Sequence, residues 1–134
     1  MAHARATIGT TNYAVAITAE HHQMNADEAP PLGGKDTGPA PFELLCSALG
    51  ACTAITLRMY AERKAWPLRG VQVDLHFSGN GKDGAIARVL SFDDDLSEEQ
   101  RARLADIAEH PGDADAQEWG RDHDDAGVIT MHIA

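Results

Sequence analysis

A chain of 134 residues is long enough for one hydrophobic core and too short for two, so we expect residues 1–134 to form a single domain. Its formal net charge of −10 would repel nucleic-acid phosphates and anionic lipids, so we expect no nucleic-acid partner and no membrane partner. Because its start lacks the apolar stretch of a signal peptide and no run approaches about 20 apolar residues, we expect a cytoplasmic protein.

The first predicted elements are strands. Between residues 7 and 19, apolar and β-branched residues alternate loosely with polar ones, which predicts one or two strands. Residues 20–41 are polar and rich in turn formers, so we expect an irregular loop that leads into a helix. Pro41 suits a first helical position, and good helix formers continue to Lys64, which predicts one long helix.

The predicted helix has one mainly apolar face. On a period of 3.6 residues, this face gathers Leu45, Leu49, Cys52, Thr56 and Met59. Small residues just before Cys52 keep that turn slim enough for close packing. We therefore expect the amino-terminal half of the helix to be buried and the part from Arg58 onward to meet solvent.

Two strands joined by a turn are predicted after this helix. Apolar and polar residues alternate over residues 71–78, as in a half-buried strand. Residues 79–84 are turn formers and residues 85–92 supply a returning strand, so we expect an antiparallel hairpin.

A second helix and a short strand complete the predicted order. Ser97 and Gln100 form the pattern of a capping box, which predicts a helix up to about His110, stopped by the Pro-Gly that follows. Residues 112–127 are acidic and turn-rich, and residues 128–133 alternate as a final strand. This order predicts an α+β domain whose helices pack on an antiparallel sheet.

Cys46 and Cys52 are the only cysteines in the sequence. On one helix, six residues correspond to about 9 Å of rise, more than the roughly 7 Å of Cα separation that a disulfide tolerates. A reducing compartment also keeps such thiols free unless they perform redox or metal chemistry. We therefore expect no disulfide between them, and we interpret Cys46 as a small buried hydrophobic residue.

A metal site is an alternative suggested by the histidines and acids late in the chain. These residues are His110, Asp113, Asp115, Asp122, His123, Asp124, Asp125 and His132. Their spacings match neither a zinc motif nor an EF-hand, and a solvated acidic loop explains them. We expect no metal and no cofactor.

Two stretches closely resemble the signature of the OsmC/Ohr family, the osmotically inducible and organic hydroperoxide resistance proteins. Residues 33–45 read Gly-Gly-Lys-Asp-Thr-Gly-Pro-Ala-Pro-Phe-Glu-Leu-Leu, and residues 48–61 read Ala-Leu-Gly-Ala-Cys-Thr-Ala-Ile-Thr-Leu-Arg-Met-Tyr-Ala. The continuation over residues 63–68 resembles the OsmC-like branch rather than the Ohr branch. The similarity covers the chain from about residue 7 to residue 110 and agrees with the predicted order of elements.

The resemblance implies an OsmC-like fold, in which an antiparallel sheet accompanies a long buried central helix and a second helix, and two chains intertwine as a homodimer. It also implies a reactive cysteine near the dimer interface, and Cys52 matches its position. In such enzymes the thiolate attacks an organic hydroperoxide and becomes a sulfenic acid, which a second cysteine resolves as a disulfide.

Activation of the thiolate needs a cation or hydrogen-bond donors nearby. Related enzymes use an Arg from an early loop and a Glu near the start of the central helix. Glu43 is the candidate for the second role, although nine helical residues would place it about 180° around the axis from Cys52. Contact would then require a bend, a loop or the other subunit, and the alternative role of Glu43 is to stabilise the helix N-terminus. Arg58 is expected to be a surface or dimer-interface charge.

The family's resolving cysteine is absent here. Relatives have Cys-Pro after the second helix, whereas this chain has His110-Pro111. The sulfenic acid of Cys52 would then need an external thiol or a partner subunit. Two hypotheses stay open: a thiol-dependent hydroperoxide reductase that uses Cys52, and a catalytically inactive protein of the same fold that binds a small molecule.

Overall fold

The computed structural model describes residues 2–79, 84–92 and 95–110. It contains two compact units, residues 1–45 and residues 46–134, each of which is described separately below. The expectation of a single domain therefore stays a prediction. The predicted acidic loop and final strand, at residues 112–127 and 128–133, lie outside the described residues, as does most of the turn at residues 79–84.

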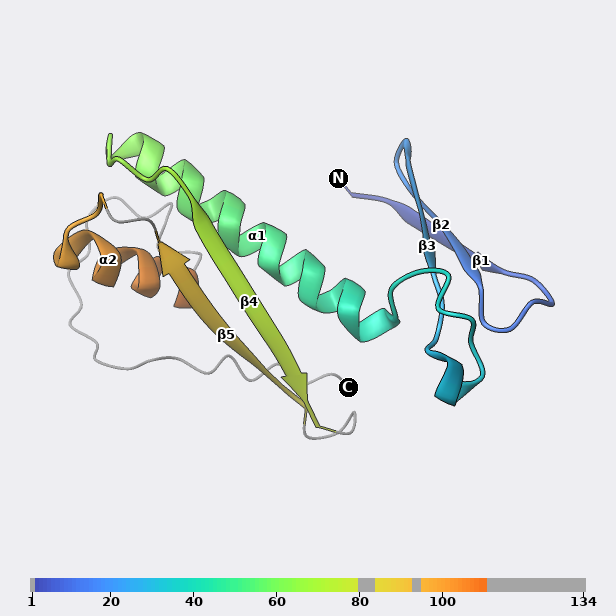
Figure 1. Cartoon of the computed structure of the whole chain (residues 1–134). Helices are drawn as coiled ribbons and strands as arrows, with labels where there is room; N and C mark the ends of the chain where they lie inside the picture. The colour runs from blue at the N-terminus through green and yellow to red at the C-terminus, as the bar shows by residue number, and fades with distance from the viewer. Residues whose placement is uncertain (1, 80–83, 93–94, 111–134) are drawn as a thin grey trace. The chain divides into compact units, whose positions relative to one another are not determined.

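The first unit is built on a three-stranded antiparallel meander of β1 (Ala4–Ile8), β2 (Val15–Ala19) and β3 (His22–Ala26), shown in Figure 1. Ala19 pairs with His22, so only two residues turn the chain between β2 and β3. The sequence predicted one or two strands and missed β3, which was wrongly assigned to the loop. Its first four residues are exposed and it therefore lacks an apolar pattern. A short 3-10 turn, η1 (Pro30–Leu32), also lies in that segment.

Helix α1 (Pro41–Arg63) confirms the predicted long helix to within one residue. Its buried side chains were predicted wrongly, because they are Thr53, Leu57, Tyr60 and Ala61, in the carboxyl-terminal half. The predicted face is instead partly open within this chain, since Cys52 and Met59 are exposed.

By length and hydropathy alone, α1 is long and apolar enough to cross a membrane, although no run of about 20 apolar residues was expected. The core helices of globular proteins pass the same test. Because the buried side chains of α1 pack with those of α2 (Glu98–Glu109), we interpret it as a core helix.

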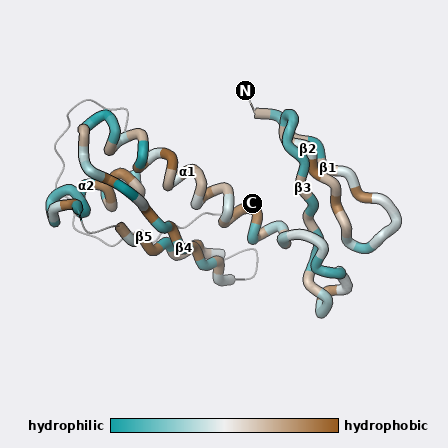
Figure 2. Tube along the Cα trace, turned by 45° about the horizontal axis from the view of Figure 1, so that its top comes forward, coloured by the Kyte–Doolittle hydropathy of each residue, from teal (hydrophilic) through white to brown (hydrophobic). Residues whose placement is uncertain are grey.

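The second unit has two layers, a hairpin and a pair of helices. Strands β4 (Val71–Ser78) and β5 (Ala85–Phe92) confirm the predicted antiparallel hairpin. Figure 2 shows hydrophilic and hydrophobic residues alternating along β4, in agreement with its strictly alternating burial. Helix α2 begins at the predicted capping box of Ser97 and Gln100, in which both reciprocal hydrogen bonds are present.

Both helices lie on one face of the hairpin. The core joins Leu57 and Ala61 of α1 to Leu104 and Ile107 of α2, with Leu90 of β5 packed against them. Toward the start of α1, a Cβ added to Gly50 would meet the Leu75 side chain at 2.9 Å, so helix and strand approach closely there. The α+β prediction is confirmed, and the homodimer stays a prediction.

Candidate active site around Cys52

The glycine-rich segment before α1 wraps around one buried carboxylate. Asp27 Oδ1 accepts backbone N–H donors from Tyr13 at 3.1 Å and Glu28 at 2.8 Å. Its Oδ2 accepts the backbone N–H groups of Lys35 and Thr37 at 3.2 Å each, and the Thr37 hydroxyl at 2.7 Å. The Thr37 hydroxyl, together with the backbone donors, holds the pKa of Asp27 well below its usual range, although burial acts in the opposite direction.

Two glycines of this segment are required by close backbone contacts. A Cβ added to Gly34 would lie 1.8 Å from the carbonyl oxygen of Glu28, and one added to Gly38 would lie 2.3 Å from that of Asn25. Side chains therefore cannot replace these hydrogens without moving the backbone. We infer that the first half of the sequence signature fixes the loop that leads into α1, rather than supplying reactive groups.

Glu43 occupies the first turn of α1. Its Oε2 accepts the backbone N–H of Ala40 at 2.8 Å, and Ala40 O in turn accepts the N–H of Leu44. This is half of a capping box, and the negative charge also complements the helix N-terminus. The geometry thus supports the structural role of Glu43, whereas its catalytic role stays a prediction.

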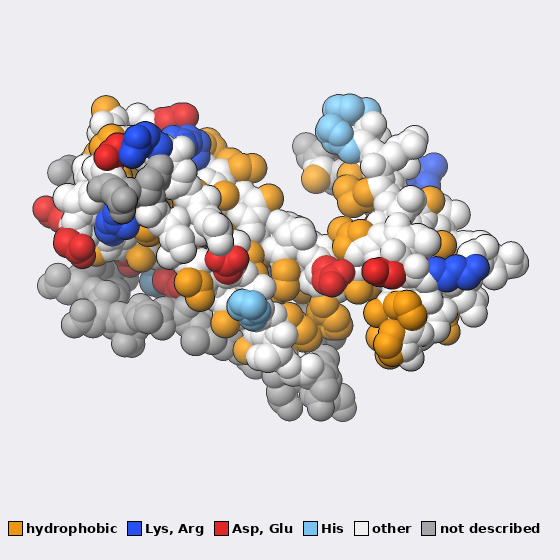
Figure 3. Space-filling model, viewed as in Figure 1, with side chains coloured by type: hydrophobic (Ala, Val, Ile, Leu, Met, Phe, Trp, Pro, Cys, Tyr) orange, Lys and Arg blue, Asp and Glu red, His pale blue; other side chains and the backbone are white. Residues whose placement is uncertain are grey.

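Cys52 lies near the middle of α1 with an exposed side chain. Ile55 and Met59, three and seven residues further on, are 59% and 55% exposed, so the thiol belongs to an open, apolar stripe of the helix. Figure 3 shows hydrophobic side chains at several places on the visible surface. Among the described residues of the second unit, none forms a hydrogen bond or ion pair with the Cys52 thiol. Cys46 is free and half-buried.

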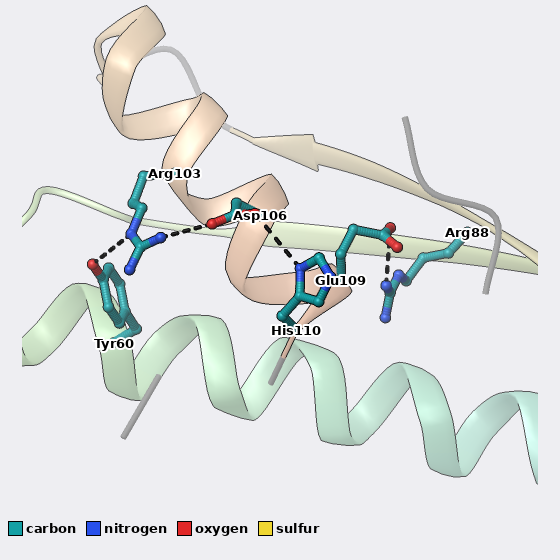
Figure 4. Close-up of polar contacts among 6 residues, drawn as sticks. All are labelled: Tyr60, Arg88, Arg103, Asp106, Glu109 and His110. Carbon is teal, nitrogen blue, oxygen red and sulfur yellow. Dashed lines mark hydrogen bonds and ion pairs between the residues drawn. The ribbon is translucent and has the colours of Figure 1, made fainter. Parts of the chain in front are cut away.

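The residue after Cys52 is held inside the second unit. Thr53 is 4% exposed, and its hydroxyl donates to Leu49 O at 2.9 Å. The same oxygen accepts a hydrogen bond from Arg88 Nη1 of β5 at 3.0 Å. Arg88 Nη2 also donates to Glu109 Oε1 at the end of α2, at 3.2 Å. One guanidinium therefore connects β5, α1 and α2, as Figure 4 shows for its pairing with Glu109.

A second group of polar side chains also connects α1 and α2 (Figure 4). Arg103 Nε donates to the Tyr60 hydroxyl at 3.1 Å, and its Nη1 donates to Asp106 at 2.7 Å. The hydrogen bond to Tyr60 and the neighbouring Asp106 raise the pKa of Arg103. His110 Nδ1 lies 3.6 Å from the other oxygen of Asp106.

Arg58 forms hydrogen bonds within the subunit, and its expected role as a surface or dimer-interface charge stays a prediction. Its guanidinium donates to the carbonyl oxygens of Leu68 and Arg69, and so ties α1 to the segment before β4. Among the described residues there is no group of three metal-ligating side chains.

The sequence model of one family, described as OsmC-like protein, matches residues 34–111, more than half of the chain. The chain belongs to the OsmC-like protein family. A search of curated protein sequences gives no match.

Solved structures with the same fold support the OsmC-like assignment. An organic hydroperoxide resistance protein OsmC of Legionella pneumophila, described as a predicted redox protein, has a TM-score of 0.67 and 17% identity, over 83% of each chain. The OsmC-like protein of Mycoplasma pneumoniae has a TM-score of 0.66 and 16% identity, over 85% of this chain and 84% of its own. An organic hydroperoxide resistance protein of Elizabethkingia anophelis has a TM-score of 0.65 and 16% identity, over 83% and 82%.

Sequence reasoning located the OsmC-like signature helix and Cys52 but missed Arg88. A charged residue in a strand is usually a surface residue, so its residue type alone does not indicate that Arg88 is buried. Its register carried the signal, because Arg88 lies between Ile86 and Leu90 on the inward face and pairs directly with Leu75.

Proposed function

We propose that this OsmC-like chain reduces organic hydroperoxides, with Cys52 as the attacking thiolate and an external thiol as the reductant. The observation that carries the proposal is the position of Cys52 within the family signature. Its side chain is exposed on α1, and the next residue, Thr53, is buried and hydrogen-bonded. An exposed thiol on a rigid helix can meet a substrate without unfolding.

The chemistry follows from thiolate nucleophilicity. The Cys52 thiolate attacks the terminal oxygen of the hydroperoxide, the O–O bond breaks, and the alkoxide that leaves takes a proton to become an alcohol. Cys52 is thereby oxidised to a sulfenic acid. An external thiol condenses with it to give a mixed disulfide and water, and a second thiol then releases Cys52 and leaves as the disulfide.

An external thiol is part of the proposal because the chain offers no suitable second cysteine. Cys46 lies on the same continuous helix, and the position that matches the family's Cys-Pro is His110-Pro111. We further propose that the protein acts as a homodimer in the cytoplasm, in which Cys52 lies near the interface and stays open to the substrate. We propose the partner subunit as the source of a cation or hydrogen-bond donor that activates the thiolate.

Turnover tests the proposal. The native chain and Cys46→Ser should consume cumene hydroperoxide with dithiothreitol as the reductant, whereas Cys52→Ser should not. Consumption by Cys52→Ser at the native rate would overturn the proposal. If no variant turns over and cumyl alcohol still raises the melting temperature, the chain is the inactive binding protein of the second hypothesis.

A further inference from the structure

Arg88 carries a charge that is buried away from the surface. Its side chain is only 2% exposed, whereas that of Arg69, another arginine in an ion pair, is 67% exposed. Burying a guanidinium is costly unless its charge and its donors are satisfied. Glu109 supplies the opposite charge and Thr53 a neutral acceptor, so each terminal nitrogen of Arg88 has a partner.

Thr53, the neutral partner of Arg88, directly follows Cys52 in the sequence. Thr53 Oγ1 uses a lone pair to accept from Arg88, which leaves its proton for the carbonyl oxygen of Leu49, one turn earlier. These two hydrogen bonds fix the orientation of the hydroxyl and hold the helical turn from Leu49 to Thr53 in place. Cys52 lies within this turn.

Rotation of α1 at this turn would move the thiol. Consecutive side chains on a helix point about 100° apart, so a buried, anchored Thr53 directs the neighbouring Cys52 outward. Gly50 lies in the same turn, and a Cβ added to it would lie 2.9 Å from the Leu75 side chain, so the sheet leaves this turn little room to rotate. The direction of Cys52 therefore depends on how Thr53 is held.

We propose that Arg88 is a positioning residue for Cys52. It holds Thr53, and thereby the turn of α1 that carries the thiol, against β5 and the end of α2. The inference deepens the proposed function and rests on it. Arg88 does not contact the reacting atoms, and the Arg88–Glu109 pair is neutral overall, so its role is to set the direction of the sulfur rather than to supply charge to it.

The test uses a pair of substitutions that separates the hydroxyl from the bulk of Thr53. Thr53→Val keeps the shape but loses the acceptor for Arg88, whereas Thr53→Ser keeps that acceptor. Arg88→Met removes the anchor itself. Arg103→Met is the matched control, because it removes a different guanidinium that also links α1 and α2, through Tyr60 and Asp106.

Two reagents are compared at a pH where the rate no longer rises with pH. Reaction with cumene hydroperoxide requires the sulfur to align with the breaking O–O bond in the site, whereas iodoacetamide needs only an exposed thiolate. Thr53→Val and Arg88→Met should slow the hydroperoxide reaction about tenfold, while Thr53→Ser and Arg103→Met stay close to the native rate. All four variants should alkylate as the native chain does.

The inference is overturned if Thr53→Val reacts with hydroperoxide at the native rate, or if Thr53→Ser is slowed as much as Thr53→Val. If Arg88→Met fails to fold, the two Thr53 variants decide the matter alone. A native chain that alkylates but ignores hydroperoxide overturns the proposed function, and the inference with it. A native chain that reacts, with all variants unchanged, overturns the inference alone.

Discussion

Glu109→Gln is predicted to destabilise the protein more than Arg88→Met, although it is the smaller chemical change. At an effective dielectric constant of about 20, unit charges 3.2 Å apart attract by about 5 kcal/mol before desolvation is counted. Glu109→Gln leaves the guanidinium of Arg88 charged and 2% exposed, with no opposite charge beside it. Arg88→Met leaves a carboxylate that is 22% exposed and can be hydrated, and it fills the space with an apolar side chain.

We therefore expect a loss of about 2–3 kcal/mol in the free energy of unfolding for Glu109→Gln and about 1 kcal/mol for Arg88→Met. Urea unfolding at neutral pH, followed by far-ultraviolet circular dichroism, measures both values, provided that the denaturant slope is unchanged. Adding Glu109→Gln to Arg88→Met should cost almost nothing more, because no buried cation remains. A larger loss for Arg88→Met than for Glu109→Gln would refute this reasoning.

Two further predictions concern the loop before α1. Because folding lowers the pKa of Asp27, its stabilisation is present above the pKa of an unfolded aspartate and is lost as the pH falls through the folded value. The protection of the amides that donate to it, measured as the exchange rate relative to the unfolded rate at the same pH, should therefore fall in acid in the native chain and depend less on pH in Asp27→Asn; equal pH dependence would contradict this role. Gly34→Ala should cost about 2 kcal/mol or more in thermal unfolding, because its Cβ would collide with Glu28 O, whereas Gly9→Ala, with nothing within 4 Å, serves as the matched control. Equal effects of the two alanines would show that the loop relaxes freely.

Local patterns predicted most of the elements. Pro41 and the run of helix formers predicted the start and length of α1, and strict alternation predicted both ends of β4 correctly. Strand β3 has no such pattern because it is exposed along most of its length, and its pairing with β2 depends on contacts that no short window of sequence contains.

The site could be predicted only in part. Cys52 is marked by its surrounding motif, but the buried side of α1 was predicted from the wrong residues. The sequence predicts large apolar side chains such as Met59 in the core, whereas the buried side chains of α1 include Thr53 and Ala61. When a helix has apolar residues on two sides, the periodicity of the sequence does not show which side packs in the core of its own chain. Arg88 was missed because its burial depends on a partner 21 residues away.

The most direct test of the central claim is intact-mass analysis after a brief pulse of cumene hydroperoxide in the presence of dimedone, which captures sulfenic acids. The native chain and Cys46→Ser should each gain one dimedone adduct, and Cys52→Ser should gain none. Absence of an adduct in the native chain, or an adduct that persists in Cys52→Ser, would contradict the assignment of Cys52 as the attacking thiol.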